Sequence, residues 1–515
     1  MRLLPAVLLL FLLAIHPARS APVRGAVATD HVLASQAGAY VLRMGGNAVD
    51  AVVTAALVLG VVQPAGSGLG GGGFAVVARK GESWALDFRE TAPAAATRDM
   101  FLKAGTSSTL GGLAVAVPSE AFGLVELQHR FGRLEWSQVV MPAITLAKSG
   151  FTPGKHLLDG LLKIPAMASL FGDSYKRSAL AKTLVGLATS HGKLFHEGWI
   201  ADDIVDSVRA AGGILTTPDL KNYKVEERVP LKGSYEGYSV VTMPSPSSGG
   251  TALLEMLGAT EGVNSLLCEV EAAKHAMARR AITGGDQPAS SAPAVDPARV
   301  AAIRADCGPQ TFPPEHYGAL VAPLDDHGTA HLSVLDGDGL AVALTTTLNT
   351  AFGSQVVTAR GGILLNNEMD DFTAHPGQPN ASGLMQSEAN AVAPGKRPLS
   401  SMSPTILMDA SGTPVMVVGA SGGPFIITAT YQVIRNVLDH HLGAAAAVAA
   451  PRWHHQWQPN IVLLERGQPV QILSDAGHAT KEVEGSSAAQ VVVALNGTLD
   501  AGADPRKGGE PVVLQ

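Results

Sequence analysis

The sequence predicts a globular α+β protein, and three observations support this fold class. The chain has 515 residues, of which 46% are hydrophobic and only 16% are charged, so it can bury a large core. Alternating helical and strand patterns continue to about Gly250. The part that follows residue 328 is rich in strand patterns, and the chain shows no internal repeat.

The first twenty residues have the pattern of a secretory signal peptide. Arg2 supplies the positive start, residues 3–15 form an apolar run, and small residues precede Ala21 at a cleavable position. The apolar run is too short for a comfortable bilayer span, although an uncleaved anchor is the alternative. We therefore expect a mature chain without a membrane segment, either periplasmic or secreted.

Charge and cysteine content narrow the function classes. The net charge of −7 comes without a basic stripe, which argues against a nucleic-acid partner. Cys268 and Cys307 can pair in an oxidising compartment, and two buried free thiols are the alternative. Neither has the spacing of a metal site or a CxxC redox motif.

The stretch 35–64 reads as two helices. Ser35 can cap the first helix and a Gly-Gly pair ends it, while Asn47 caps the second helix and Gln63 ends it. The second helix is apolar on nearly all sides, so we expect it to be buried. A glycine-rich loop at 66–73 then leads into a strand. It lacks the Gly-Lys-Ser/Thr of a phosphate-binding loop, which favours close backbone packing as the reason for its glycines.

Residues 284–328 are rich in Pro, Ser, Ala and Gly, which predicts a loop or linker. "HGTAHLSVLDGDGLAVALTTTLN" follows at 327–349 and predicts a hairpin with Thr329 at its head. A threonine hydroxyl is a poor nucleophile without an adjacent base. If the Gly328–Thr329 bond were cut, the new α-amino group, with a reference pKa of about 7.7–8.0, would become that base. Gly-Thr before a strand is common, so this pattern alone does not establish a cut.

The stretch "VMVVGASGGPFIITATYQVI" places a glycine-rich turn between a strand and a helix. It matches the G-x-S-x-G nucleophile elbow with Ser421 as the nucleophile, and Asp475 and His478 follow in the order of a catalytic triad. Alternatively, Gly422 and Gly423 form a backbone nest that offers N–H groups to a developing oxyanion. A plain tight turn is the third interpretation.

Acidic, hydroxyl and basic side chains in three further motifs suggest a site for an amino-acid head group. Carboxylates would hold its ammonium group, and an arginine with hydroxyls would hold its carboxylate. A cation site, a helix cap or ordinary turn residues are the alternatives for the separate motifs. The residues are Arg89 in "LDFRET", Glu368, Asp370 and Asp371 in "LLNNEMDDF", and Ser400 and Ser401 in "KRPLSSMSPT".

Taken together, the motifs resemble those of gamma-glutamyltransferase (gamma-glutamyltranspeptidase, glutathione hydrolase) proenzymes of the bacterial periplasmic type, which are N-terminal-nucleophile hydrolases. The resemblance covers nearly the whole mature chain. The motifs that carry it are "GGNAVDAVV", "SGLGGGGF", "LDFRETAPAAATRDMF", "PSPSSGG", "TAHLSV", "TLNTAFG", "GGILLNNEMDDF", "KRPLSSMSPTI", "GASGG", "APRWHHQWQPN" and "GADPR".

The resemblance implies a four-layer αββα sandwich formed jointly by two fragments of one precursor. The large subunit would be residues 21–328, with a flexible segment at about 284–328, and the small catalytic subunit would be residues 329–515. The two fragments would form a heterodimer. No metal or cofactor is implied.

The implied activity is a self-processing acyltransferase and threonine-type peptidase. It would cleave the gamma-glutamyl amide of glutathione and related compounds through an ester on Thr329, and pass the group to water or to an amino acid or peptide. Thr329 would also be the residue of self-cleavage, and Thr347 would orient it. The other implied roles are substrate binding by Asn349, carboxylate binding by Arg89, Ser400 and Ser401, amine binding by Glu368 and Asp371, and an oxyanion hole at Gly422 and Gly423.

The sequence also departs from the family pattern. Ala330 replaces the second threonine of the usual Thr-Thr-His, and Ser382 stands where lidded bacterial members carry an aromatic residue. Arg279 stands where the family has an acidic residue, and the segment before the cut is shorter than usual. We expect these changes to affect processing, lid closure or acceptor choice.

Three alternatives to this function remain at this stage. Related N-terminal-nucleophile enzymes hydrolyse glutaryl-cephalosporins, whose side chain has no α-amino group; Glu368 and Asp371 favour the gamma-glutamyl substrate, because they would otherwise lack an ammonium partner. A serine hydrolase that uses Ser421 is the second alternative. An exported binding protein without catalysis is the third.

Overall fold

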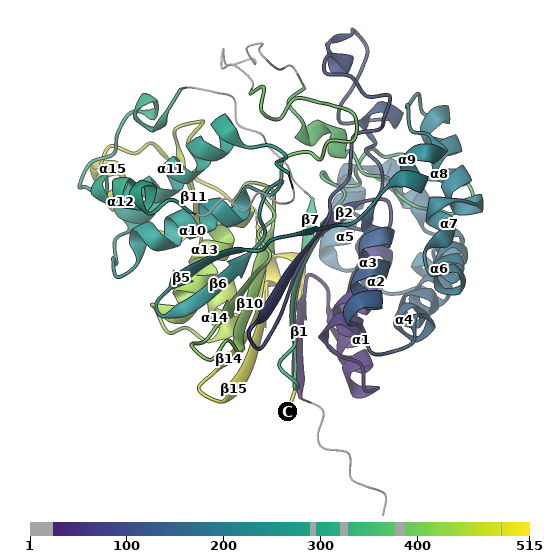
Figure 1. Ribbon diagram of the computed structural model, residues 1–515, viewed down its shortest axis with the longest axis horizontal. Helices are drawn as coiled ribbons and strands as arrows, with labels where there is room; N and C mark the ends of the chain where they lie inside the picture. Colours follow the sequence, from purple (N-terminus) through teal and green to yellow (C-terminus); the bar gives the residue numbers. More distant parts are fainter. Residues whose placement is uncertain (1–23, 289–294, 320–327, 375, 377–386, 486) are drawn as a thin grey trace, which may run out of the picture.

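Two antiparallel sheets lie face to face, and helices cover the outer face of each sheet (Figure 1). These features come from a computed structural model that describes residues 24–288, 295–319, 328–374, 376, 387–485 and 487–515. The signal-peptide pattern at 1–20 and Ser382 lie outside the described residues. The four-layer αββα arrangement that the resemblance implies is confirmed.

The first sheet has seven strands, and the strands that carry the predicted hairpin are near its centre. In spatial order they are β16 (Val512–Leu514), β1 (Gly25–Thr29), β7 (Thr329–Asp336), β8 (Ala341–Thr347), β2 (Gly72–Arg79), β3 (Glu82–Phe88) and β4 (Glu226–Arg228). The predicted hairpin is thus confirmed as β7 and β8, with Thr329 paired across from Thr347.

The second sheet has six strands, and a small third sheet lies apart from it. The six strands are β15 (Thr498–Ala503), β14 (Ala488–Leu495), β10 (Pro414–Ser421), β9 (Thr405–Met408), β6 (Tyr238–Thr242) and β5 (Leu231–Tyr235). The third sheet contains β11 (Trp453–His454), β12 (Val462–Leu464) and β13 (Thr480–Glu482). Strand β10 packs against β7 and β8 across the interface between the two large sheets.

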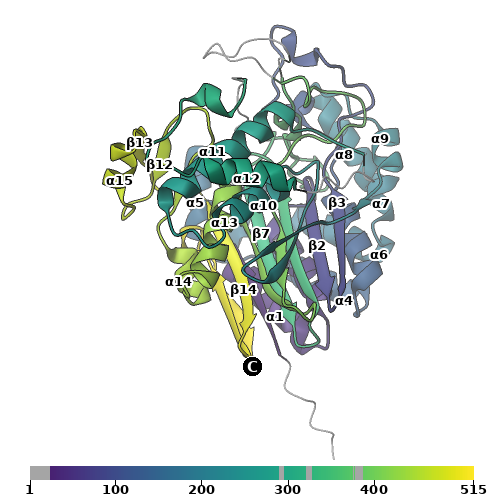
Figure 2. The same cartoon turned by 60° about the vertical axis from the view of Figure 1, so that its left-hand side comes forward.

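Helices form the two outer layers. On the side of the seven-stranded sheet lie α1 (Val32–Arg43), α2 (Ala48–Val62), α3 (Glu120–Phe131), α4 (Trp136–Ser149), α5 (Lys155–Lys163), α6 (Ser178–Ser190), α7 (Lys193–His196), α8 (Trp199–Ala210) and α9 (Thr217–Asn222). On the other side lie α10 (Gly249–Thr260), α11 (Leu266–Thr283), α12 (Pro297–Ala305), α13 (Phe425–Leu438), α14 (Ala444–Ala449) and α15 (Val470–Asp475). Figure 2 shows α10 to α13 in front of the strands of the six-stranded sheet.

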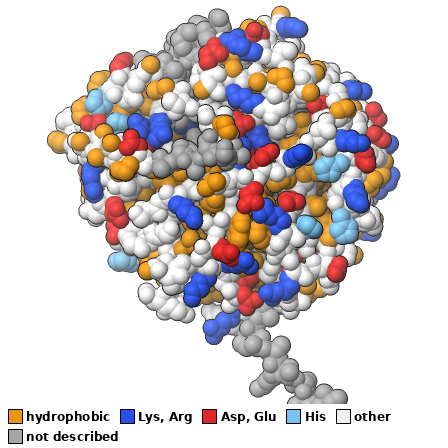
Figure 3. Space-filling model, viewed as in Figure 1, with side chains coloured by type: hydrophobic (Ala, Val, Ile, Leu, Met, Phe, Trp, Pro, Cys, Tyr) orange, Lys and Arg blue, Asp and Glu red, His pale blue; other side chains and the backbone are white. Residues whose placement is uncertain are grey.

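Short 3-10 helices connect several of these elements. They are η1 (Met100–Leu102), η2 (Gly112–Ala114), η3 (Pro165–Leu170), η4 (Asp173–Tyr175), η5 (Pro314–Tyr317), η6 (Glu368–Asp371) and η7 (Pro505–Lys507). Among the described residues, no helix is long and apolar enough to cross a membrane. On the face drawn in Figure 3, basic and acidic side chains are interspersed.

Strand β7 serves two cores because its side chains alternate between the two faces of the sheet. Ala330, Leu332 and Val334 belong to the core beneath the helices α1 to α4. His331 packs against Gly419 of β10, and Ser333 Oγ donates to a carbonyl of β14. The same alternation places the side chain of Thr329 between the two sheets.

The helix predicted from Asn47 to Gln63 is confirmed as α2. The Asn47 side chain accepts from the N–H groups of Val49 and Asp50, and Asp50 accepts from the N–H of Asn47 in return, which completes a capping box. Every residue of α2 except Gly60 is buried, as its all-round apolar character predicts. The preceding helix begins earlier than predicted, because the cap of α1 is His31 and not Ser35.

The segment 284–328 is not devoid of regular structure. In its described part it contains α12 and η5, so the prediction of a plain loop is wrong there. Asp296 caps α12 by accepting from Ala298 N, and Pro297 occupies its first turn. The two cysteines form a disulfide between Cys268 of α11 and Cys307 just after α12, with Cα atoms 4.5 Å apart.

Candidate active site

Thr329 and Thr347 meet where β7 begins and β8 ends. Thr329 is only 3% exposed, and its Oγ1 donates to Thr347 Oγ1 at 3.3 Å. Thr347 Oγ1 donates to the carbonyl oxygen of Gly328 at 2.8 Å and accepts from Asn349 N at 2.8 Å. The hydroxyl of Thr347 therefore polarises the carbonyl of the very peptide bond at which the resemblance places the cut.

Glycines permit the backbone to come close to this pair. A Cβ on Gly71 would overlap the carbonyl oxygen of Thr347, which confirms that the glycine-rich loop serves close packing. Gly328 has φ +147°, and a Cβ there would lie 2.6 Å from the carbonyl oxygen of Asn349. The loop and the residue before Thr329 thus accept only glycine without rearrangement.

Asn349 connects the two threonines to the acidic motif. It adopts a left-handed backbone conformation with φ +72°, which asparagine tolerates better than most residues. Its Nδ2 donates to the carbonyl oxygen of Asn367 at 3.1 Å, and Thr350 N donates to Asn367 Oδ1 at 3.1 Å. Within the described part of the chain, Asn349 Oδ1 has no hydrogen-bond partner, so this buried acceptor is available to a ligand.

Directly after Asn367, η6 carries two carboxylates that pair with Arg89. The Arg89 guanidinium, at the end of β3, forms hydrogen-bonded ion pairs with Glu368 and with Asp371. All three side chains are at most 4% exposed. Burial alone would lower the pKa of Arg89, but the two carboxylates outweigh it and raise that pKa.

Glu90 is a further carboxylic acid beside this cluster, and it was not among the residues predicted from the sequence. Its Oε2 lies 3.7 Å from Arg89 Nη1, and the side chain is fully buried. Burial raises the pKa of Glu90 to about 8, against the opposing effect of Arg89. Burial thus favours the protonated form of Glu90, whereas Glu368 and Asp371 form ion pairs with Arg89.

Ser400 and Ser401 adjoin the same arginine. Arg89 donates to the carbonyl oxygens of Pro398 at 3.3 Å and Leu399 at 3.1 Å, directly before the two serines. Ser400 Oγ accepts from Met402 N at 3.1 Å. Ser401 is fully buried, and its Oγ has no hydrogen-bond partner among the residues that the structure describes.

Asp370 lies apart from this cluster. It accepts a hydrogen bond from Ser108 Oγ at 2.5 Å, and the Arg89 guanidinium has no bond to it among the described residues. Of the three acidic residues in the motif, the structure thus brings Glu368 and Asp371 to the arginine and leaves Asp370 outside.

Gly422 and Gly423 form the turn between β10 and α13. Their φ values are +119° and +60°, which place both residues in conformations that favour glycine. In the described part of the chain, the N–H groups of both residues lack an acceptor. Two such donors side by side at the end of a buried strand have the geometry of an anion-binding nest.

Lys507 joins this turn to Thr329, and sequence reasoning missed it. Its Nζ donates to the carbonyl oxygen of Thr329 at 2.6 Å and to Ser421 Oγ at 2.7 Å, and it pairs with Asp30 Oδ2 at 3.1 Å. Burial raises the pKa of Asp30, against the opposing effect of Lys507. No local pattern points to these residues, because they come from opposite ends of the chain.

The structure contradicts the Ser421 triad. Ser421 is fully buried, and its Oγ contacts Lys507, Asp30 and the carbonyl oxygen of Ala488. His478 lies elsewhere, with its Nε2 3.5 Å from Glu271 Oε1. Asp475 is at the end of α15, where its carbonyl accepts from Gln310. Ser421 therefore has no histidine base among the described residues.

Two departures from the family pattern can be placed. Ala330 is buried in the core beneath the helices, on the face of β7 opposite to Thr329. A threonine hydroxyl at that position would lie in this apolar core, so the alanine keeps the core apolar on the face of β7 opposite to Thr329. Arg279 forms an ion pair with Glu255 on α10, which explains how a basic residue is accommodated on α11.

An αββα sandwich in which β7, with Thr329 at its start, packs against β10, which ends at the Gly422–Gly423 turn, has the architecture of the N-terminal-nucleophile hydrolases. Solved structures agree. Cephalosporin acylase from Bacillus halodurans matches with a TM-score of 0.81 and 26% identity over 98% of this chain and 99% of that chain. Helicobacter pylori gamma-glutamyltranspeptidase matches with a TM-score of 0.52 and 34% identity over 55% of this chain and 92% of that chain.

Sequence comparison identifies the family within this class. The profile of the gamma-glutamyltranspeptidase family matches residues 34–514. The glutathione hydrolase proenzyme of Escherichia coli K12 is 38% identical over 95% of this chain and 91% of its own length, and that of Pseudomonas aeruginosa is 37% identical over 95% of each. The chain belongs to the gamma-glutamyltranspeptidase family, and the prediction made from its motifs is confirmed.

Proposed function

We propose that this protein is a self-processing gamma-glutamyl transferase and hydrolase that acts on glutathione and related gamma-glutamyl compounds. The observation that carries the proposal is the contact between Thr329, Thr347 and the carbonyl of Gly328. Asn349, two residues after Thr347, donates to the carbonyl oxygen of Asn367, which directly precedes the acidic motif. The protein acts without a cofactor, after removal of residues 1–20, in the periplasm or outside the cell.

Processing begins when Thr329 Oγ1 attacks the carbonyl carbon of Gly328. The Thr347 hydroxyl, which already donates to the oxygen of that carbonyl, stabilises the negative charge that develops there. The C–N bond breaks as the C–O bond forms, and the nitrogen takes the proton, which gives an ester and a free α-amino group on Thr329. Water then hydrolyses the ester, which breaks the covalent link between residues 21–328 and residues 329–515. The two fragments remain associated as a heterodimer.

The freed α-amino group then serves as the base for substrate turnover. Thr329 Oγ1 attacks the gamma-carbonyl of the donor, and the N–H groups of Gly422 and Gly423 bind the oxyanion. The C–N bond breaks, the amine leaves with the proton, and the gamma-glutamyl group remains as an ester on Thr329. Water, or the amino group of an amino acid or peptide, cleaves this ester in the second half of the reaction.

When the donor binds, its charged groups replace the contacts that Arg89, Glu368 and Asp371 make with one another. Arg89 pairs with Glu368 and Asp371 in the free site. We assign the donor ammonium to Glu368 and Asp371, and the α-carboxylate to Arg89, Ser400 and Ser401. Asn349 Oδ1 and Ser401 Oγ lack partners within the described chain and supply further hydrogen bonds.

The structural similarity to a cephalosporin acylase favours a second candidate, hydrolysis of a glutaryl side chain. The charge of the site argues against it. One guanidinium, that of Arg89, is paired with two carboxylates, those of Glu368 and Asp371. A zwitterionic head group adds no net charge to this site, whereas a glutaryl carboxylate adds a further −1. The cluster therefore selects the α-amino group.

A comparison of two chromogenic donors tests this function. We expect the processed protein to hydrolyse a gamma-glutamyl anilide with a kcat/KM at least roughly tenfold above that of the matching glutaryl anilide, as a lost charged hydrogen bond implies. Thr329→Ala should stay a single chain without activity. Thr498→Ala, at an exposed position on β15, is the matched control and should behave as wild type. Equal or better use of the glutaryl donor would overturn the gamma-glutamyl assignment.

A further inference from the structure

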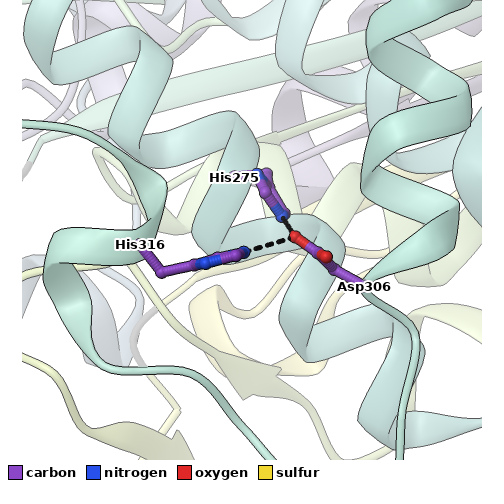
Figure 4. A group of neighbouring side chains, drawn as sticks. All are labelled: His275, Asp306 and His316. Carbon is purple, nitrogen blue, oxygen red and sulfur yellow. Dashed lines mark hydrogen bonds and ion pairs between the residues drawn. The ribbon is translucent and has the colours of Figure 1, made fainter.

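Two histidines and an aspartate meet near the end of the proposed large fragment, away from the site described above (Figure 4). His275 belongs to α11, Asp306 is the residue that ends α12, and His316 lies in η5. Asp306 Oδ2 lies 2.8 Å from His275 Nε2 and 2.6 Å from His316 Nε2. The ligand atoms of the three residues all lie within 4.8 Å of one another.

We propose that His275, Asp306 and His316 form a binding site for a divalent transition-metal ion of the Zn²⁺ type. Imidazole nitrogen and carboxylate oxygen are ligands that such ions prefer. Bond lengths of about 2.0–2.2 Å in tetrahedral geometry separate two ligand atoms by roughly 3.3 Å. Each nitrogen–oxygen distance must therefore open by only about 0.5–0.7 Å, which small side-chain rotations supply.

The surroundings hold both imidazole rings in place. Phe312 stacks on His316 with ring centroids 4.1 Å apart and 13° between the planes. The ring of Tyr317 packs against His275 at 4.8 Å and 76°. A site whose ligands are fixed by their neighbours loses less entropy when it binds an ion. The two Nε2 atoms are thus held on either side of Asp306 Oδ2, so all three ligand atoms converge on one place (Figure 4).

Access and local charge also suit a metal ion. The exposed fraction of the side chain is 11% for His275, 22% for Asp306 and 35% for His316, so the cluster opens to solvent on one side. Water can enter there and complete the coordination. The neighbouring cation Lys274 does not compete, because its Nζ contacts Phe312 O at 3.0 Å and Glu271 Oε1 at 3.4 Å.

The ion would fasten the end of the large fragment to the body of the protein. Cys268 and Cys307 already tie α11 to the residue that follows Asp306. A metal ion would add a second tie at His316, nine residues after Cys307, between α11 and the chain that leads to Gly328. This consequence rests on the proposed cleavage after Gly328, whereas metal binding itself does not.

Calorimetric titration with Zn²⁺ tests the site on processed protein that carries no histidine tag and has been stripped with a chelator. We expect one equivalent of Zn²⁺ to bind, and His316→Ala and Asp306→Asn each to weaken binding at least roughly tenfold. His440→Ala is the matched control, because this exposed histidine lies between α13 and α14 and should leave binding unchanged. Ca²⁺, which prefers sites made of oxygen ligands, should bind far more weakly.

Three outcomes would overturn the proposal: no stoichiometric uptake by the wild type, equal uptake by His316→Ala, or equal binding of Ca²⁺. His316 is partly exposed, so its truncation should not prevent folding, and gamma-glutamyl turnover checks this independently. The experiment distinguishes failure of the metal site from failure of the proposed enzymatic function. Loss of Zn²⁺ binding with retained gamma-glutamyl turnover would contradict only the metal site, and Zn²⁺ binding without turnover would contradict only the enzymatic function.

Discussion

Replacement of Thr347 by valine isolates the hydroxyl that contacts the proposed cleavage bond. Valine keeps the branched shape of threonine and suits a strand, so β8 should remain intact. The change removes the donor to Gly328 O and the acceptor for Asn349 N, both at 2.8 Å. Loss of one donor to a developing oxyanion costs about 2.7–4 kcal/mol, or about 10²–10³ in rate. We therefore expect Thr347→Val to self-process about 10²–10³ times more slowly than wild type.

A time course of precursor made by cell-free translation measures this rate on a denaturing gel. Thr347→Ser keeps the hydroxyl and should process close to the wild-type rate. Thr345→Val makes the same chemical change two residues earlier on the same face of β8, where the hydroxyl contacts His331 at 2.8 Å. It should lower stability without slowing processing. Processing of Thr347→Val at the wild-type rate would refute the role assigned to this hydroxyl.

Two further predictions concern buried charges around the site. Lys507→Met leaves the fully buried Asp30 without its ion-pair partner, so the free energy of unfolding should fall by about 3–5 kcal/mol in a urea titration, with Lys481→Met on exposed β13 as the control. The loss should shrink at low pH, because the raised pKa of Asp30 lets it become neutral. Glu120→Gln removes a carboxyl whose pKa burial raises from 4.5 to about 7. The pKa of Glu120 is higher in the folded protein than in the unfolded chain, so the proton stabilises the folded state at low pH. The free energy of unfolding of the wild type should therefore fall by about 3 kcal/mol as the pH rises from about 4.5 through 7. Glu120→Gln should lack this fall.

Each of these predictions has a contradicting result. An unchanged urea midpoint in Lys507→Met would mean that solvent, and not Lys507, compensates the charge of Asp30. For Glu120, the quantity to compare is the difference in unfolding free energy between Glu120→Gln and wild type. The contributions of the other titrating groups to the pH dependence are common to both proteins and cancel in this difference. If that difference is the same at pH 5 and pH 8, Glu120 is not the buried neutral acid described above.

Local patterns predicted the elements that depend on neighbouring residues. The cap at Asn47, the hairpin from Thr329 and the glycine turn at Gly422 all follow from short-range chemistry, and the structure confirms them. The start of α1 was wrong because a histidine nitrogen, which capping rules do not include, accepts the N–H of Leu33. The composition of residues 284–328 favours a loop and conceals α12, although Asp296 and the proline after it are a helix-start signal.

Contacts between distant parts of the chain were beyond this kind of prediction. The motifs indicated Arg89, Glu368 and Asp371 as separate binders of a carboxylate and an amine. Only the fold shows that the arginine pairs with both carboxylates, because β3 and η6 approach each other in space. The same holds for Lys507 beneath Thr329 and for the three residues of the proposed metal site. Each of these residues looks ordinary in its own sequence neighbourhood.

The most direct test of the central claim is the intact mass of the purified protein after a brief incubation with a gamma-glutamyl donor and an acid quench. The account predicts two chains, the smaller one covering residues 329–515 and carrying one added gamma-glutamyl group on Thr329. Thr329→Ala should remain one chain without that addition. A single uncut chain that turns over the donor at full rate, or a gamma-glutamyl group on any residue other than Thr329, would contradict the account.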